Sequence, residues 1–290
     1  MADTSAEQDI RGIDIDKLAK GFADEQIIFK KFISVTSTKA REIRWYQKTA
    51  GFLDSVDTTA ITDSQIANVS FKSRPVVVEQ SWTRNTSYVR KYFVESPWLS
   101  DEDIKDTDID ILATNVRDLV RAVERQVDSR IYTVLSTGTG VQTAAATADG
   151  WDDAVTGNPI LDILNAKQMI RSYGYNPEGA VLAINSIEHK NLVNYLIAVK
   201  GSSIPSFSSA AVGTGVVMEI LGLNVVVSEN CTTDQALIFT RDAAIWKSFI
   251  PITSVKIEDK GIGTKIRVWE EGEIILTDPK ACFLITDTVT

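Results

Sequence analysis

The chain offers few residues that could carry out chemistry, and only one of them is a histidine. Any Ser-His-Asp, Cys-His or histidine-containing metal site would have to be built on His189. Four residues earlier stands Asn185, and Asn185 with Glu188 has the spacing of a capping box at a helix start. This pattern predicts a surface histidine in a first helical turn and not a catalytic base.

The other chemical candidates are two cysteines, two glycine-bearing stretches and an acidic run. Cys231 and Cys282 form no Cys-x-x-Cys pair, which is typical of buried thiols in a reducing compartment. The stretches 136–140 and 211–215 do not continue into a phosphate-binding pattern and indicate flexible connectors. The run 101–110 lacks the glycine and terminal glutamate of a calcium loop. We therefore expect no catalytic, cofactor-binding or metal site, no cofactor, and a protein that is not an enzyme.

Composition narrows the class of protein further. Of 290 residues, 44% are hydrophobic and 24% are charged, which is typical of a globular protein. The formal net charge is -9, which argues against a sequence-independent grip on nucleic acid as the main activity. The first ten residues are acidic and polar, unlike a secretory signal, and no run of about 18 apolar residues predicts a membrane span.

The first half of the chain predicts an arm, a hairpin and a long helix. Residues 1–35 hold short amphipathic pieces that are too short to fold alone. The β-branched and aromatic stretches 41–47 and 75–95 predict strands, and the polar residues 51–73 between them predict a long hairpin with a polar tip. The arm and hairpin carry apolar residues that one chain is poorly placed to bury, which are Trp45, Phe71, Val76, Val78 and Trp82.

The longest helix is expected over 107–135, with Thr107 as its N-cap and Asp110 in its first turn. Its apolar positions at helical spacing are Leu112, Val116, Leu119, Val120, Val123, Val127, Ile131, Val134 and Leu135. Its other face, expected to be solvated or to form an interface, carries Arg117, Asp118, Arg121, Glu124, Arg125 and Asp128. Residues 136–157 are expected to be a connector.

The second half predicts an α/β unit followed by long strands. Asn158 and Pro159 start a helix that Gly174 ends, and a second helix follows Asn185. Strands are expected at 179–184, 216–220, 223–228 and 236–240, and then at 255–258, 265–269, 274–277 and 281–286. We expect the strands of the two ends of the chain to pair with each other.

This order of elements resembles the major capsid proteins of tailed double-stranded DNA viruses with the Hong Kong 97 fold. The stretches that carry the resemblance are YVRKYFVE at 88–95, DILA at 110–113, ERQVDSRIY at 124–132, YNPEGAVLA at 175–183, LGLNVVVS at 221–228 and TDPKACFLI at 277–285. The resemblance implies an α+β fold with an N-arm at 1–40, an extended E-loop hairpin at 41–90, a P domain at 91–154 with a spine helix at 107–135, an A domain at 155–240, and return strands of the P domain at 241–290.

The sequence departs from the family's pattern in two ways. Only some 40 residues precede the first E-loop strand, so a scaffolding domain of the kind that some members carry is expected from another protein or from lost residues. Some members also join an E-loop lysine to a late asparagine. Lys48 and Lys72 could donate, and Glu270, Glu271 and Glu273 could accept a proton, but no asparagine follows Asn230 and the one later amide is Gln235. We therefore expect a shell held together without covalent cross-links.

The resemblance implies a virion capsid protein that is assembled in the host cytoplasm into hexamers and pentamers around double-stranded DNA. Expected partners are further copies of the chain, portal and scaffolding proteins, and a decoration protein, with no membrane partner and no sequence-specific DNA binding. An acidic wall would also avoid clinging to packaged DNA. Two alternatives stay open, an encapsulin-like cellular nanocompartment shell, which encloses protein cargo, and a soluble α/β enzyme with residues 158–240 as its catalytic domain.

Overall fold

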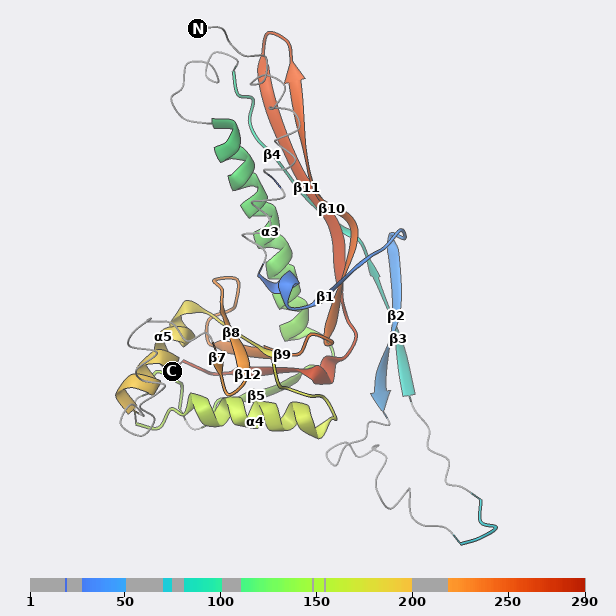
Figure 1. Ribbon diagram of the computed structural model, residues 1–290, viewed down its shortest axis with the longest axis vertical. Coiled ribbons are helices and arrows are strands. Elements are labelled where there is room, and N and C mark those ends of the chain that lie inside the picture. Colours follow the sequence, from blue (N-terminus) through green and yellow to red (C-terminus); the bar gives the residue numbers. More distant parts are fainter. Residues whose placement is uncertain are drawn as a thin grey trace.

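Figure 1 shows the computed structural model of the chain, an elongated molecule with a long helix and long strands at one end and an α/β unit at the other. The structure describes residues 19, 28–50, 70–74, 81–100, 111–147, 149–153, 155–199 and 219–289. The long strands form a four-stranded sheet in the order β1-β10-β11-β4, with the bounds β1 (Ser34–Ser37), β10 (Ala244–Asp259), β11 (Gly263–Leu276) and β4 (Arg90–Glu95). Strand β1 is parallel to β10, and the other neighbours are antiparallel, so the two ends of the chain pair as expected.

The long helix is α3 (Ile111–Thr137), which lies along one face of this sheet (Figure 1). Its apolar stripe packs on the sheet, because Val116, Val120 and Val123 are buried in one cluster with Ile266 and Val268 of β11. The periodicity of the sequence therefore predicted the buried face correctly, although the helix ends at Thr137. The expected N-cap Thr107 lies outside the residues that the structure describes.

Two residues of the predicted solvated face are buried instead. Glu124 and Asp128 are each only 1% exposed. The N-terminal segment covers this flank of α3, beginning with the single 3₁₀ turn Phe29–Lys31. A helical pattern shows where polar residues fall around the axis, but it does not show that a segment almost a hundred residues away covers some of them.

The α/β unit is a six-stranded sheet in the order β5-β12-β9-β6-β8-β7. Its strands are β5 (Gln142–Ala145), β6 (Val181–Ile184), β7 (Glu219–Ile220), β8 (Leu223–Val227), β9 (Gln235–Phe239) and β12 (Cys282–Thr286). Helices α4 (Pro159–Ser172) and α5 (Ser186–Asn194) belong to it, and α5 runs into the π-helical turn Tyr195–Val199. Asn158 caps α4 as expected, since its side-chain oxygen accepts a hydrogen bond from the Leu161 backbone N–H.

Strand β12 corrects the expectation that the end of the chain returns wholly to the long strands. After the 3₁₀ turn Pro279–Ala281, it pairs with β5 and β9 of the six-stranded sheet. Its residues alternate between two cores, with Cys282 and Leu284 in the cluster that includes α3 residues and Phe283 and Ile285 in the cluster that includes α4 residues. A strand buried on both faces needs a central place in a covered sheet. Its partner β5 also lies inside the stretch 136–157, which was expected to be a connector.

The long strands are more continuous than expected. The sequence predicted separate strands at 265–269 and 274–277, divided by the polar residues 270–273, and no strand at 244–254. In the structure, β11 instead runs without a break from Gly263 to Leu276. The stretch 244–254 belongs to β10, which pairs along β11 with register shifts near Ile250. At Gly272 there is no room for a side chain, because a Cβ would lie 2.4 Å from the Trp246 ring.

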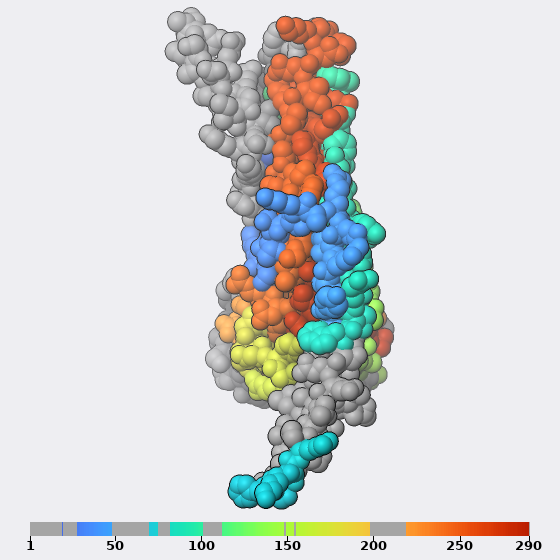
Figure 2. Space-filling model, turned by 90° about the vertical axis from the view of Figure 1, so that its right-hand side faces the viewer, coloured from blue at the N-terminus to red at the C-terminus, as the bar shows by residue number. Residues whose placement is uncertain are grey.

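The predicted hairpin is formed by β2 (Glu42–Ala50) and β3 (Ser81–Tyr88), which pair from Glu42 opposite Tyr88 to Ala50 opposite Ser81. The predicted stretch 75–95 is thus divided, with β3 in the hairpin and β4 in the four-stranded sheet. Figure 2 shows the hairpin lying over the lower part of the long strands, on the side opposite α3 in Figure 1. The remaining parts of the predicted hairpin, at 51–69 and 75–80, are outside the described residues.

Candidate assembly surfaces

The hairpin β2–β3 is tied to the body on one side and exposes aromatic rings on the other. Trp45 Nε1 and Gln47 Nε2 both donate to the backbone oxygen of Leu276, at 2.8 and 2.6 Å. Tyr46, Trp82 and Tyr88 are 62%, 55% and 64% exposed. Exposed rings of this size on one projecting element are typical of a surface that another chain covers.

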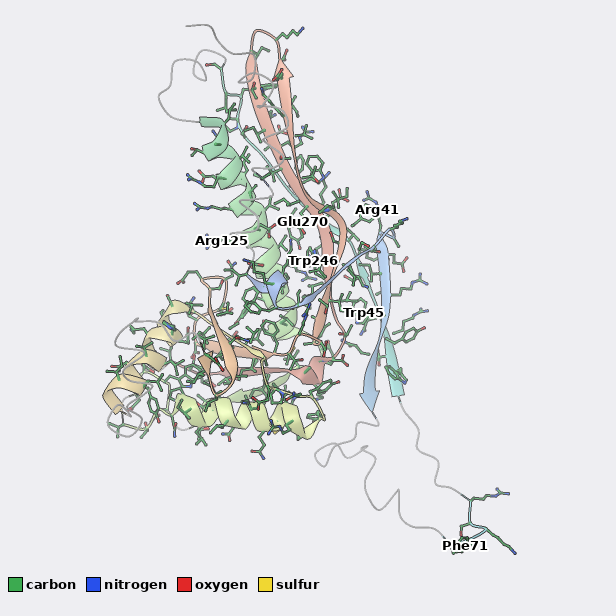
Figure 3. All side chains as sticks on the ribbon, in the orientation of Figure 1. Arg41, Trp45, Phe71, Arg125, Trp246 and Glu270 are labelled. Atoms are coloured by element: carbon green, nitrogen blue, oxygen red, sulfur yellow. The ribbon has the colours of Figure 1, made fainter. Side chains whose placement is uncertain are left out.

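Phe71 lies at the far end of this projection. Figure 3 shows it well away from the body of the molecule, and its side chain is fully exposed. Of the apolar residues that the sequence left without cover, Phe71 and Trp82 are therefore exposed as expected. Trp45 is not, because it is half-buried against its own chain. Val76 and Val78 lie outside the described residues.

A second exposed surface lies on the upper part of the four-stranded sheet, on the face away from α3. Phe93, Trp98 and Val255 are exposed there. Cations stack on its rings, with Lys91 Nζ 5.0 Å from the Phe93 ring centre and the Arg267 guanidinium 5.3 Å from the same ring. A cation over an aromatic ring is attracted to it even at an exposed site. Arginine and aromatic residues are also enriched in protein interfaces.

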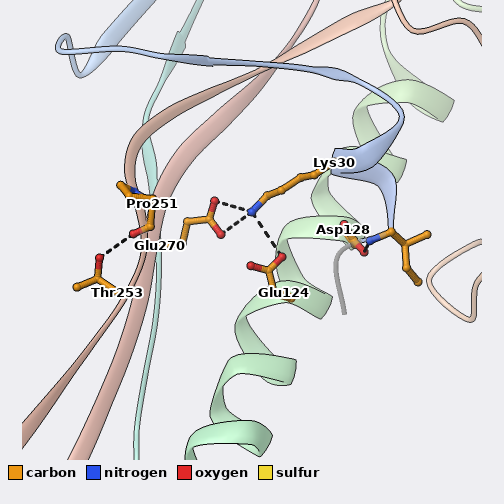
Figure 4. A network of polar contacts seen from close by, with 7 residues as sticks. Lys30, Glu124, Asp128, Pro251, Thr253 and Glu270 are labelled. Atoms are coloured by element: carbon orange, nitrogen blue, oxygen red, sulfur yellow. Dashed lines mark hydrogen bonds and ion pairs between the residues drawn. The ribbon is translucent and has the colours of Figure 1, made fainter. Parts of the chain in front are cut away.

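The third feature anchors the N-terminal segment, and Figure 4 shows it from close by. Lys30 Nζ lies 2.6 Å from both carboxylate oxygens of Glu270 on β11 and 3.4 Å from Glu124 Oε2 on α3. The backbone N–H of Ile28 donates to Asp128 Oδ2 at 3.1 Å. The segment is thereby joined to the helix and to the sheet. We call Lys30, Glu124, Asp128 and Glu270 the arm anchor.

The arm anchor holds three buried carboxylates and one ammonium group. Burial raises the pKa of Glu124 to about 8, with Lys30 acting against this shift and Glu270 and Asp128 adding to it. Burial likewise raises the pKa of Asp128 to about 6, although the Ile28 N–H lowers it. The ionised forms of these groups are disfavoured where no cation balances them, so the charge of this junction depends on pH.

Two further glutamates of β11 extend the same arrangement. Glu273 is fully buried and pairs with Arg130 of α3 at 2.6 Å and with Arg90 of β4 at 3.0 Å. Glu271 lies 3.7 Å from Arg41 and 3.6 Å from Lys91. Three carboxylates on one central strand therefore connect the arm, the helix, the hairpin base and β4.

The structure separates the residues that the sequence analysis considered for chemistry. Cys231 and Cys282 are buried free thiols, as expected, and burial raises the pKa of Cys231 to about 12. His189 is half-buried rather than a surface residue, and burial lowers its pKa. Asn185 caps α5 by accepting from the Ile187 N–H, but Glu188 does not complete a capping box. Glu188 Oε1 instead accepts a hydrogen bond from the Asp234 N–H. The sequence pattern of the helix alone could not indicate this contact with a distant residue.

The candidates for a covalent cross-link serve other purposes in the fold. Gln235 begins β9 and accepts a hydrogen bond from the Tyr132 hydroxyl. Lys72 is exposed, in the short stretch 70–74, and the Lys48 side chain lies outside the described part of the structure. Within the described part of the chain, no group of three or more His, Cys, Asp or Glu side chains could hold a metal ion. No helix among the same residues is long and apolar enough to cross a membrane.

The arm anchor was not predicted from the sequence, and only a weak pattern pointed to it. Lys30 stands beside Lys31 in a stretch of aromatic and aliphatic residues, and polar residues interrupt the otherwise apolar β11 at 270–273. A run of acids inside a strand pattern, together with lysines inside an apolar arm, is the pattern that buried ion pairs require.

A model of the phage capsid protein family matches residues 98–285, about two thirds of the sequence, and this range includes α3, the long strands β10 and β11, and the strands of the six-stranded sheet up to residue 285 of β12. The chain belongs to this family. It is a tailed-phage major capsid protein with the Hong Kong 97 fold, and its role is that of a structural component of a virion shell. No curated protein matches it significantly by sequence.

Solved structures share the fold at low sequence identity. The capsid of the cyanophage P-SCSP1u has a TM-score of 0.64 at 11% identity, over 91% of this chain and 89% of that one. The virus-like particle from Pyrococcus furiosus has a TM-score of 0.62 at 12% identity, over 95% and 99%. Mycobacterium phage Che8 has a TM-score of 0.58 at 17% identity, over 87% and 86%.

Proposed function

We propose that copies of this capsid protein form the hexamers and pentamers of an icosahedral shell that encloses a double-stranded DNA genome. The observation that carries the proposal is the exposed aromatic surface of the projecting hairpin β2–β3, where Tyr46, Trp82 and Tyr88 are left uncovered by the described part of the chain. The face around Phe93 and Trp98 is also exposed and aromatic, and we assign it as the surface that contacts the hairpin of a neighbouring copy. Contacts between two different patches, repeated around an axis, close into rings.

The proposal assigns a role to each part of the chain. Residues 1–40 act as an N-arm that Lys30 anchors, and residues 41–90 act as the E-loop that reaches a neighbouring copy. Residues 91–154, with the spine helix, and the return strands from 241 form the P domain. Residues 155–240 form the A domain, and β12 is shared with its sheet.

The partners and the place of assembly belong to the same proposal. The shell assembles in the host cytoplasm and receives DNA through a portal protein. A separate scaffolding protein guides the assembly. A decoration protein binds outside. The DNA is enclosed without recognition of its sequence, and no membrane takes part.

The test is assembly of purified protein, followed by light scattering and negative-stain electron microscopy. Wild-type protein should give closed shells or rings. Trp82→Ala should reduce assembly at least tenfold while leaving the subunit folded, because the ring is 55% exposed in the single chain. Val155→Ala is the matched control, since Val155 is 90% exposed elsewhere and its loss should change nothing. A monodisperse monomer of about 32 kDa across physiological salt would contradict the proposal.

The likeness to the Pyrococcus furiosus particle favours one alternative, a cellular nanocompartment shell. Such a shell would use the same surfaces and enclose protein. The two functions differ in what purified particles contain. Nuclease-protected nucleic acid supports the phage capsid, whereas a co-purifying enzyme without nucleic acid supports the compartment.

A further inference from the structure

The exposed side of α3 carries three arginines, each one helical turn from the next. Arg117, Arg121 and Arg125 are four residues apart, so their positions repeat about every 6 Å along the helix and span about 12 Å. Arg121 and Arg125 are exposed, and Arg117 is half-buried. Figure 3 shows Arg125 on the side of α3 away from the sheet. We call these three residues the arginine row.

The arginine row keeps most of its positive charge. Glu124 and Asp128 of the same helix are buried in the arm anchor and do not neutralise it. Asp118 lies 3.6 Å from Arg117 and balances part of the charge at that end of the row. Glu229 faces Arg125 from the turn after β8, where it accepts a hydrogen bond from Asn185. Arg121 and Arg125 have no carboxylate partner among the described residues.

The surface beside Arg125 is hollowed on both flanks. One hollow, of about 810 Å³, lies between α3 and β4 and is lined by residues 91–94. The other, of about 410 Å³, lies between Arg121, Ile28 and the turn after β8. Arg125 borders both hollows. Its guanidinium group is therefore open to a large ligand from more than one side.

We propose that the arginine row binds backbone phosphates of the duplex DNA inside the shell, an inference that rests on the proposed function and places this side of α3 toward the lumen. The guanidinium fork matches the phosphate group and can donate two hydrogen bonds to it. A span of about 12 Å covers three or four phosphates of one strand, which are spaced by about 3.4 Å along the duplex axis. The contacts involve no bases and are independent of sequence.

The positive charge of the arginine row is concentrated at one place, so DNA can bind there although the whole chain is acidic. The net charge of -9 repels DNA from most of the surface, while the arginine row attracts it at one repeated position. Each subunit supplies only a few contacts, but many subunits act together on one long polyanion. An acidic protein segment is the other ligand that such a row could take. The regular spacing and the exposed guanidinium forks favour phosphate.

The first test measures nucleic acid inside particles. Shells of wild type, Arg121→Gln/Arg125→Gln and the control Arg241→Gln are purified after nuclease treatment, and protected nucleic acid is measured per shell. Arg241 is an exposed arginine in the turn before β10. The double variant should form shells of the same size but hold several-fold less nucleic acid, and the control should match wild type. Equal contents in all three, or an equal loss in the control, would overturn the proposal.

The second test uses unassembled full-length protein and a labelled duplex of about 20 base pairs, followed by fluorescence anisotropy. Three phosphate contacts predict that wild-type affinity falls about 40-fold between 50 and 200 mM salt, and one remaining contact predicts about 3- to 4-fold. An unchanged salt dependence in the double variant would overturn the proposal. So would a poly-glutamate peptide that competes as well as unlabelled duplex. If wild type forms no shells, the proposed function fails and this measurement alone decides on the arginine row.

Discussion

Replacing Glu124 with glutamine should make the protein more stable at alkaline pH. Glu124 is 1% exposed and shares Lys30 with Glu270, which lies closer to the ammonium group. Burial raises its pKa from 4.5 to about 8. Glutamine has nearly the same shape and keeps an oxygen that can accept from Lys30, but it cannot ionise.

The sign and size of the effect follow from linkage between protonation and folding. At neutral pH the folded chain holds a proton on Glu124 that the unfolded chain has released, so the free energy of unfolding falls as the pH rises. With pKa values of about 8 and 4.5, the loss between pH 6 and pH 9 is about 3 kcal/mol. The stabilisation is fully present below pH 4.5 and is lost as the pH passes through 8.

The assay is urea unfolding of wild type, Glu124→Gln and Asp118→Asn at pH 6, 7, 8 and 9, with the assembly state held constant and checked by light scattering. Asp118 is an exposed carboxylate on the same helix and serves as the control. Wild type and the control should lose about 3 kcal/mol across this range, and Glu124→Gln should lose at least about 2 kcal/mol less. If wild type and Glu124→Gln follow the same pH dependence, the burial and charge assigned to the arm anchor are wrong.

Three further predictions concern the core and the shell. Val120→Asp should destabilise the protein by about 3 kcal/mol or more in urea unfolding, because it buries a carboxylate in an apolar cluster. The control Arg121→Ala should leave the fold intact. A soluble Val120→Asp protein of normal stability would mean that the buried face of α3 is misassigned. Gly272→Ala should cost about 1–3 kcal/mol, since its Cβ would lie 2.4 Å from the Trp246 ring, and unchanged stability would count against this packing. Boiled, reduced particles should run as a single band near 32 kDa on a denaturing gel, and a surviving ladder of multimers would reveal covalent cross-links.

The features that depend on local periodicity could be predicted from the sequence alone. The apolar spacing of α3 identified the buried Val116, Val120 and Val123, because a helix places every third and fourth residue on one face. The β-branched stretches gave most of the strands, and Asn158 marked the start of α4. The scarcity of histidine and cysteine argued against a catalytic site, and the order of elements predicted the capsid family to which the chain belongs.

The burial of polar residues and the position of the closing strand could not be predicted from local patterns. Glu124 and Asp128 are hidden because Lys30 and Ile28, almost a hundred residues away in the chain, pack against them. The acids at 270–273 do not break β11, because cations from α3, β4 and the arm balance them. Strand β12 joins the six-stranded sheet because its two faces fill two separate cores. These outcomes depend on contacts between distant segments, and the burial of a charge is tolerated only where such a contact supplies its partner.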